Sequence, residues 1–362
     1  MLDKSTKTTL KKIADQLGFS VSTVSRVLNG KAATHRISKK TAAIILKTAK
    51  ELNFIPNQLA RGLRLQKTLT IGLVIPDISN PFFSSIARSV EIEARKLNYS
   101  IMLCDSQEST FHEKDSLQQL LSRKVDGLII SPVGEDDGHL EQLNKNGMPF
   151  VVMDRQFSKL KCSSVMSDNY HGALEAVEYL IECGHKKIAC IQGLLNSSVN
   201  KDRVRGFKDA HKSHNIPIDD SLLVGDSFGE RNGYLGAKLL LNKHSRPTAI
   251  FALSNLISLG AIRAINEEEL KIPEDISLLS FDDHPYSDFL ATPLTTITQQ
   301  EVNMGKIAIK ILFEQMNSPE KFEPLQVKLP TKLIKRKSVK KLNRKFYNDV
   351  DRNGQYEQAI NA

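Results

Sequence analysis

The chain has 362 residues, which is more than one hydrophobic core usually serves, so its length predicts a large domain together with a smaller one. Hydrophobic residues make up 40% and charged residues 25% of the chain, as in an ordinary soluble protein, and no apolar run approaches the roughly 18 residues that a membrane span needs. The opening residues are polar and basic, unlike a secretory signal. We therefore expect a cytoplasmic protein with no membrane contact.

The net charge of +9 is concentrated at the two ends of the chain. Residues 1–67 carry 14 Lys and Arg against 3 Asp and Glu, and residues 335–362 carry 8 against 3, which leaves a net charge of −7 between them. Cationic side chains displace the counterions of nucleic-acid phosphates, and an acidic body limits nonspecific adhesion. The pattern favours a nucleic-acid binder, with a solvated charged surface as the alternative.

The four cysteines and the sequence motifs argue against a metal site, a cofactor and catalysis. Cys104, Cys162, Cys183 and Cys190 form no CxxC pair, so buried thiols in a reducing compartment are the simpler interpretation. Cys183 and His185 have no second ligand pair at zinc-site spacing. The chain also lacks GxGxxG, HExxH and a P-loop, so we expect no enzyme activity.

The apolar spacing of the N-terminal region predicts three short helices. The first covers about residues 10–17 and can end at Gly18, where a left-handed conformation is available to glycine. Ser20 can cap a second helix, and a third apolar run spans residues 38–52. Residues 1–54 are therefore predicted to form an all-α helix-turn-helix domain.

The second helix has one apolar and one polar face. Its polar face carries Ser22, Ser25, Arg26 and Asn29. A recognition helix presents such side chains to base edges in the major groove, where an arginine on a guanine contributes about 1–3 kcal/mol of discrimination. A purely structural helical bundle is the alternative interpretation.

Two runs between residues 9 and 64, TLKKIADQLGFSVSTVSRVLNG and SKKTAAIILKTAKELNFIPNQLARGLR, closely resemble the head of the lac repressor and gal repressor family of transcription regulators. The stretch 30–37 is longer than is usual in the family. The resemblance implies that Val21, Ser22 and Arg26 read bases. It also implies that four residues lie nearer the DNA backbone: Thr9, Ser20, Ser25 and Asn29.

Residues 55–67 have the features of a hinge between the head and the rest of the chain. The residue before Pro56 should be extended, and Asn57 can cap a following segment that is shorter than the ~12–15 residues an isolated helix needs. Gly62 weakens that segment by a further ~1 kcal/mol. The family resemblance makes it a minor-groove hinge helix in which Leu63 wedges between base pairs. A flexible tether is the alternative.

In residues 68–334 the pattern alternates between apolar strands and amphipathic helices, which predicts two α/β lobes with parallel sheets. Segments near residues 299–316 and 325–329 are predicted to return to the first lobe. Ligands sit at the carboxyl ends of such strands, and the residues there are polar. They are Asp77 to Phe83, Asp105, Ser131, Asp154, Gln192, Asn255 and Asp282. For each residue alone, loop capping is the alternative.

IGLVIPDISNPFF, VDGLIISP, GHKKIACIQG and GAIRAINE in this body are similar to the same family. The resemblance implies a two-lobed, periplasmic-binding-protein-like (type I) effector domain, with a small molecule in the cleft. It assigns effector contacts to Phe82, Phe83, Asp168, Arg203, Asn255 and Asp282. A sugar or sugar derivative is the family's usual effector. Ser197 stands where purine-responsive relatives carry a basic residue, which disfavours a purine.

The last stretch, residues 335–362, is polar and basic, and it is predicted to be a disordered tail, with a weak auxiliary DNA contact as the alternative. The sequence as a whole predicts a ligand-responsive transcription regulator, most often a repressor in this family. It would bind a pseudo-palindromic double-stranded operator as a homodimer. A solute-binding module and a DNA binder without ligand control are the rival hypotheses.

Overall fold

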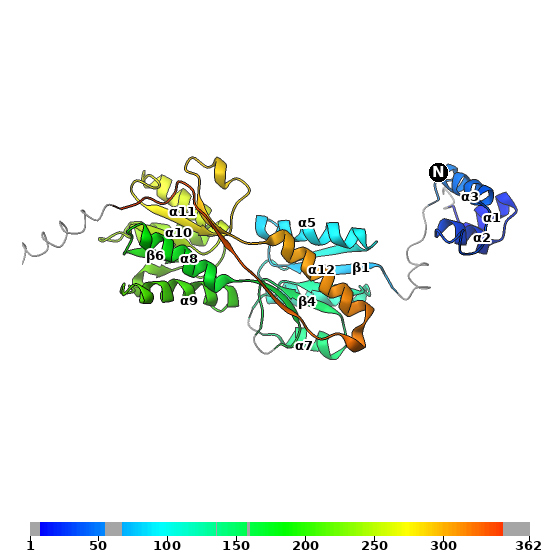
Figure 1. Cartoon of the computed structure of the whole chain (residues 1–362), viewed down its shortest axis with the longest axis horizontal. Coiled ribbons are helices and arrows are strands. Elements are labelled where there is room, and N and C mark those ends of the chain that lie inside the picture. Colours follow the sequence, from blue (N-terminus) through cyan, green and yellow to red (C-terminus); the bar gives the residue numbers. More distant parts are fainter. Residues whose placement is uncertain (1–7, 55–66, 135, 158–159, 343–362) are drawn as a thin grey trace, which may run out of the picture. The chain divides into compact units, whose positions relative to one another are not determined.

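The computed structural model describes residues 8–54, 67–134, 136–157 and 160–342 (Figure 1). It divides into two compact units, the head (Met1–Thr68) and the body (Leu69–Ala362). Of the predicted hinge at 55–67, residues 55–66 lie outside the described residues. Within the described ranges, no helix combines the length and the apolar character needed to cross a membrane.

The head has the three helices that the sequence predicts: α1 (Leu10–Leu17), α2 (Val21–Leu28) and α3 (Lys39–Glu51). The side-chain oxygens of Thr9, Ser20 and Ser38 each accept a hydrogen bond from the backbone N–H three residues later, which begins each helix. Gly18 ends α1 with a φ of 67°. The core is formed by Ile13, Ala14, Val24, Val27, Ile45 and Ala49. The helix-turn-helix prediction is confirmed.

The first lobe of the body is a six-stranded sheet in the order β11-β5-β4-β3-β1-β2, and all its described pairings are parallel. Its strands are β1 (Thr70–Ile75), β2 (Ser100–Asp105), β3 (Gly127–Ile130), β4 (Phe150–Met153), β5 (Ser163–Ser167) and β11 (Gln326–Leu329). One face packs against α5 (Pro81–Lys96) and α12 (Glu301–Asn317), and the other against α6 (Thr110–Ser122) and α7 (Gly138–Lys145). Helices on both faces explain why the inner strands are apolar throughout.

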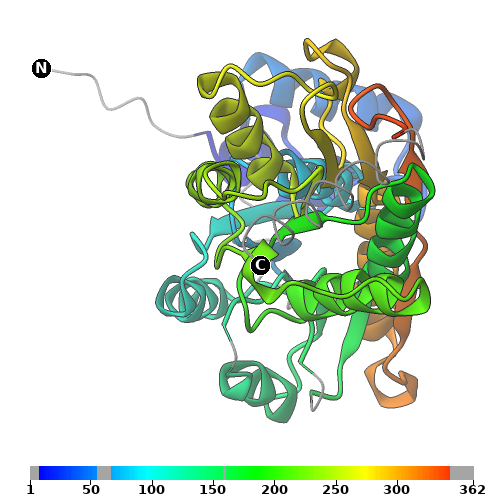
Figure 2. The same cartoon turned by 90° about the vertical axis from the view of Figure 1, so that its left-hand side faces the viewer.

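The second lobe repeats this architecture in the order β12-β10-β9-β8-β6-β7, with only the β10–β12 pair antiparallel among the described pairings. Its strands are β6 (Ile188–Ile191), β7 (Leu223–Val224), β8 (Ala249–Ala252), β9 (Ser277–Phe281), β10 (Thr295–Thr298) and β12 (Lys332–Ile334). Figure 2 shows α8 (Asn169–Glu182) and α9 (Ser198–Ser213), in green, opposite α10 (Glu230–Leu241) and α11 (Asn255–Glu267), in yellow-green to yellow. The two-lobed α/β prediction is confirmed.

Three crossings connect the two lobes, from β5 to α8, from β10 to α12 and from β11 to β12. Figure 1 shows the last crossing running past both sheets. Short segments of this kind act as hinges, because they absorb the backbone rotation while the packed lobes stay rigid. Helix α12 and strand β11 therefore return to the first lobe, as the sequence predicts.

The second lobe continues to Leu342, so the prediction that a disordered tail begins at residue 335 is wrong for residues 335–342. The buried Ser338 Oγ donates to the carbonyl of Leu278 at 2.6 Å and accepts from the N–H of Thr295 at 2.8 Å. The N–H of Leu342 donates to the carbonyl of Cys183 at 2.8 Å. This segment, the strap (residues 335–342), is held by polar contacts, which a basic composition does not reveal. Residues 343–362 lie outside the described residues.

Removal of the strap is expected to destabilise the body. A chain that ends after Ile334 should unfold several degrees below one that ends after Leu342. The reason is that the partners of Ser338 become buried polar groups without hydrogen bonds, each costing about 1–3 kcal/mol. Thermal unfolding followed by circular dichroism measures the difference. Equal melting temperatures for the two chains would show that the strap contributes nothing.

Candidate ligand-binding and nucleic-acid-binding sites

A cavity of about 270 Å³ lies between the two lobes. The first lobe contributes Asp77, Asn80, Phe82, Phe83, Glu108, Asp154 and Arg155, and the second contributes Leu194, Val199, Arg203, Ser227, Phe228, Gly229, Ser254, Leu256 and Asp282, with Gln299 from the crossing after β10. Four predicted effector contacts, Phe82, Phe83, Arg203 and Asp282, therefore line one cavity. Its volume is close to the lower end of the ~300–1,000 Å³ typical of small-molecule sites.

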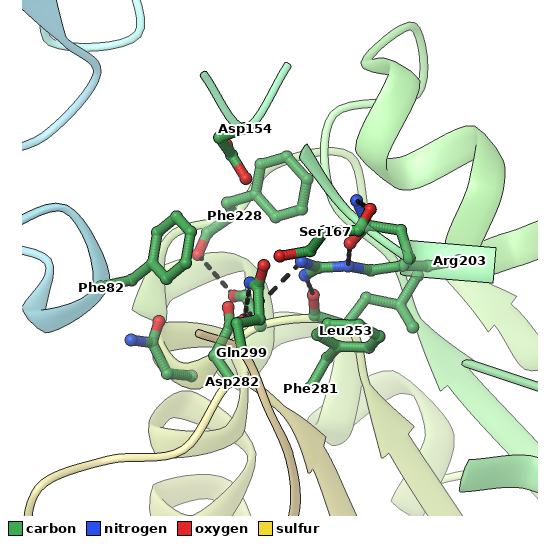
Figure 3. Close-up of polar contacts among 12 residues, drawn as sticks. Phe82, Asp154, Ser167, Arg203, Phe228, Leu253, Phe281, Asp282 and Gln299 are labelled. Carbon is green, nitrogen blue, oxygen red and sulfur yellow. Dashed lines mark hydrogen bonds and ion pairs between the residues drawn. The ribbon is translucent and has the colours of Figure 1, made fainter. Parts of the chain in front are cut away.

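Arg203 is the most extensively bound side chain of the cavity. It is buried on α9, where its Nε donates to Asn169 Oδ1 at 2.8 Å and its Nη1 donates to the carbonyl of Leu253 (Figure 3). Its Nη2 lies 3.6 Å from Asp282 Oδ1, and its guanidinium carbon lies 3.6 Å from the centroid of the Phe281 ring. These contacts fix the plane of the guanidinium, as bidentate recognition of a ligand requires.

Asp282 is presented to the cavity by an unusual backbone conformation. It follows β9 with a φ of 67°, in the left-handed region that non-glycine residues rarely adopt. Its Oδ1 also accepts a hydrogen bond from Gln299 Nε2. The Gln299 Oε1 is buried and has no hydrogen-bond partner among the described residues. An unpaired buried acceptor beside a carboxylate is suited to a ligand hydroxyl that donates a hydrogen bond.

A second aspartate faces Asp282 from the first lobe. Asp154 follows β4 with a φ of 61°, and burial raises its pKa to about 6, although Arg155 and Arg203 act in the opposite direction. Arg155 makes two hydrogen bonds of 2.6 Å to the Glu108 carboxylate. The Arg155 guanidinium also lies 5.4 Å from the ring centroid of Phe228 in the second lobe. The cavity thus has one buried carboxylate on each lobe.

Asp168 and Asn255, which are also predicted as effector contacts, are not among the described residues that line the cavity, and their assignment stays a prediction. Asp168 caps α8 and accepts from the N–H and the Nδ1 of His171, while the following residue, Asn169, reaches Arg203. Asn255 is fully buried at the start of α11, where its Nδ2 donates to Asn80 Oδ1 at 2.8 Å. Asn255 therefore joins the two lobes beside the cavity.

Among the cavity residues that the sequence did not predict, three have charged or amide side chains: Glu108, Arg155 and Gln299. Arg155 directly follows the strand-end residue Asp154, so its position was a usable signal. Gln299 follows β10, a strand that the alternating pattern did not reveal, and Glu108 has a φ of 54° in a turn after β2. Phe228 also lines the cavity, beside Arg155.

The head presents the predicted reading face on α2. Val21 is 44% exposed, and Ser22 and Arg26 are exposed, while Val24 and Val27 are buried. Four other predicted DNA contacts have structural roles. Thr9 and Ser20 cap α1 and α2, and Asn29 Nδ2 donates to the backbone carbonyl of the half-buried Ser25. Asn57 and Leu63 lie outside the described residues.

The surface of the head is strongly basic. Residues 8–54 carry nine Lys and Arg against two Asp and Glu, and all eleven side chains are exposed. A small domain with this excess attracts a phosphate backbone without regard to sequence. The exposed polar face of α2 adds the groups that discriminate among bases.

Two family models match the chain over its head and its body. Residues 9–57 match "Bacterial regulatory proteins, lacI family", and residues 68–337 match "Periplasmic binding proteins and sugar binding domain of LacI family". The chain belongs to the LacI family. It is accordingly a DNA-binding transcriptional repressor that responds to a ligand, built from a helix-turn-helix domain and a two-lobed effector domain.

Individual relatives are similar to this LacI-family chain over most of its length. It is 35% identical over 340 residues to the HTH-type transcriptional repressor PurR of Haemophilus influenzae (strain PittEE), covering 92% of this chain and 99% of the relative. A lac repressor dimer bound to operator and the anti-inducer ONPF has a TM-score of 0.82 and 28% identity, covering 92% and 100% of the two chains. A LacI-family regulator from Enterococcus faecium with bound ribose has a TM-score of 0.68 and 33% identity, covering 76% and 100%.

Proposed function

We propose that this LacI-family repressor binds a small, neutral, hydroxyl-rich effector, a sugar or sugar derivative, in the cavity between its lobes. The observation that carries the proposal is the buried Arg203–Asp282 pair beside the unpaired Gln299 Oε1. The guanidinium donates hydrogen bonds, and the carboxylate and the amide oxygen accept them. This combination suits hydroxyl groups, which are both donors and acceptors. The rings of Phe82 and Phe228 supply apolar surface in place of the tryptophan that the chain lacks.

The charges of the cavity favour a ligand without phosphate or carboxylate groups. Its lining has four carboxylates, on Asp77, Glu108, Asp154 and Asp282, against the guanidinium groups of Arg155 and Arg203. Both arginines already face carboxylates of the chain. An added anion would meet a net negative site with no uncommitted cation among the described residues of its lining, which is costly in a buried environment. The ribose-bound relative is consistent with this choice.

We propose further that the chain acts as a homodimer that places two heads on a pseudo-palindromic operator. The heads would lie in successive major grooves, with Val21, Ser22 and Arg26 toward the bases and Asn57 and Leu63 in the hinge at the centre. The lac repressor relative is described as a dimer on its operator, which supports the same arrangement. A two-fold symmetric protein matches a two-fold symmetric site.

The cavity is proposed to bind and release its ligand unchanged, in the cytoplasm where the chromosome lies. Asp282, which would otherwise be a candidate base, is held by Arg203 and Gln299, so its carboxylate is already committed to contacts within the chain. A binding protein without chemistry is therefore favoured over an enzyme.

The effector class is tested by thermal unfolding of the full chain with ribose, glucose, ribose 5-phosphate, gluconate and hypoxanthine. A ligand of the folded state raises the melting temperature as its concentration increases. We expect a shift with a neutral sugar and none with the two anions. A shift with ribose 5-phosphate alone, or with hypoxanthine alone, would contradict the proposal.

The buried Asp154 is expected to make the ligand-free protein less stable as the pH rises. Its folded pKa of about 6 lies above its unfolded value of ~3.9, so the folded state holds the proton more tightly. The contribution of Asp154 to the unfolding free energy is full below about pH 4 and declines until about pH 6. Asp154→Asn should therefore melt several degrees above the unchanged chain at pH 8, and close to it at pH 4. A difference in melting temperature between the two proteins that is the same at pH 4 and pH 8 would show that Asp154 does not titrate in this range.

A further inference from the structure

Arg336, in the strap, donates hydrogen bonds to four residues of the second lobe. Its Nη1 and Nη2 donate to the two carboxylate oxygens of Asp283 at 3.0 and 2.9 Å, and its Nε donates to Asp288 Oδ1 at 2.5 Å. Nη1 also donates to the carbonyl of Leu294 at 2.8 Å and to Thr296 Oγ1 at 3.0 Å. Only 11% of the Arg336 side chain is exposed. A bidentate, largely buried pair of this kind is geometrically specific.

The partner of Arg336 is adjacent in the chain to the cavity aspartate. Asp282 and Asp283 are consecutive residues after β9, and the left-handed backbone at Asp282 separates their side chains. Asp282 is directed to Arg203 and Gln299 in the cavity, whereas Asp283 is directed to Arg336 at the strap. The direction of one carboxylate thus constrains the direction of the other.

We propose that Arg336 is a positioning residue, which holds the Asp282–Asp283 turn so that Asp282 faces the cavity in the geometry that effector binding requires. The inference rests on the proposed function, because it assigns Asp282 to the effector. A left-handed aspartate costs about 1–3 kcal/mol of backbone strain, so the surrounding contacts must maintain it. The paired Asp283 carboxylate is the contact next to the strained residue, and Arg336 is its cationic partner.

The two aspartates bound by Arg336 differ in a way that makes the proposal testable. Asp283 is 22% exposed, whereas Asp288 is 68% exposed. Exposed ion pairs contribute little to the stability of the structure around them, because solvent screens the charges. Loss of the Asp288 contact should therefore leave the cavity intact, while loss of the Asp283 contact should release the turn.

Two readouts on the full chain test the proposal, backbone hydrogen exchange of residues 281–289 without ligand and calorimetric binding of D-ribose. The variants are Arg336→Lys, Arg336→Ala, Asp283→Asn and Asp288→Asn, with the exposed neighbour Lys337→Ala as the matched control. We expect faster exchange at residues 281–284 and at least about tenfold weaker ribose binding for Arg336→Ala and for Asp283→Asn. The double variant Arg336→Ala/Asp283→Asn should bind ribose no more weakly than the weaker-binding of the two single variants, because both changes break the Arg336–Asp283 contact. Arg336→Lys should have an intermediate affinity for ribose. Asp288→Asn and Lys337→Ala should change the affinity for ribose less than about twofold.

Unchanged exchange at residues 281–284 in both Arg336→Lys and Asp283→Asn would overturn the proposal, as would additive losses in the double variant. If Arg336→Ala fails to fold, Arg336→Lys and Asp283→Asn still decide the question. If the unchanged chain does not bind D-ribose, the choice of a sugar is at fault, and the hydrogen-exchange result still decides the role of Arg336. A melting temperature that falls while exchange rises uniformly over the whole body would indicate a merely structural role.

Discussion

Arg203→Ala is expected to weaken effector binding at least about 100-fold, because removal of one member of a buried ion pair costs about 3–5 kcal/mol. The substitution leaves Asp282 without its cation and also removes the partners of Asn169 Oδ1 and the Leu253 carbonyl. Isothermal titration calorimetry with the effector found by thermal unfolding measures the loss. Arg203→Lys should recover only part of it, since an ammonium group cannot make the same set of planar contacts.

Arg205→Ala is the matched control for Arg203. Arg205 lies on the same helix but is 59% exposed, and its ion pair is with Asp202 on the surface. Its loss should change effector affinity less than about twofold, as for other surface pairs. If both arginine variants bind the effector as tightly as the unchanged chain, the cavity is not the effector site.

Arg26→Ala is expected to have the largest effect on DNA binding, about 1–3 kcal/mol or roughly 5- to 150-fold in operator affinity, with relaxed discrimination at one base position. Arg26 is exposed on the polar face of α2. The test uses a DNA site selected from a random pool by the unchanged protein, with binding followed by fluorescence anisotropy.

Lys47→Ala on α3 provides the comparison for Arg26, since Lys47 is also an exposed cation of the head and pairs with Glu51. Its loss should weaken binding to selected and unrelated DNA by the same small factor, as for a general electrostatic contribution. The assignment of α2 as the reading helix fails if Arg26→Ala behaves in the same way as Lys47→Ala.

The contacts between the lobes suggest how the cavity communicates with the head. Asn80 and Asn255 are hydrogen-bonded across the lobes, and the N–H of Gln156 donates to Ser198 Oγ at 3.2 Å. A ligand that bridges Asp154 and Asp282 adds to these contacts and favours one arrangement of the lobes. Because β1 of the first lobe follows residues 55–66 in the chain, we propose that a change in lobe arrangement is how the effector influences the predicted hinge.

Much of this architecture was accessible from the sequence because it depends on local patterns. Capping residues such as Thr9 and Ser20 and the left-handed Gly18 located the head helices, and the buried parallel strands were visible as apolar runs. Strand β5, with the sequence SSVMS, and helix α10 were not predicted. The polar strand is recognisable only by its pairing with β4 and β11, which are distant in sequence.

The cavity was predicted less completely than the fold, for a related reason. Side chains that follow predicted strands, such as Asp154 and Asp282, were found by position alone. Asp168 and Asn255 are at the starts of helices in the correct region, but their side chains are committed to a helix cap and to Asn80. Which of two neighbours faces the cavity depends on packing between lobes, and no local pattern encodes it.

Occupancy of the cavity is expected to change operator affinity. The most direct test measures operator binding by the full chain with and without saturating effector, in the unchanged protein and in Asp282→Asn. We expect operator affinity to change about 5- to 150-fold for the unchanged protein, as is typical of allosteric coupling, and little or not at all for Asp282→Asn at the same effector concentration. An operator affinity that stays constant while calorimetry shows the effector bound would contradict this expectation.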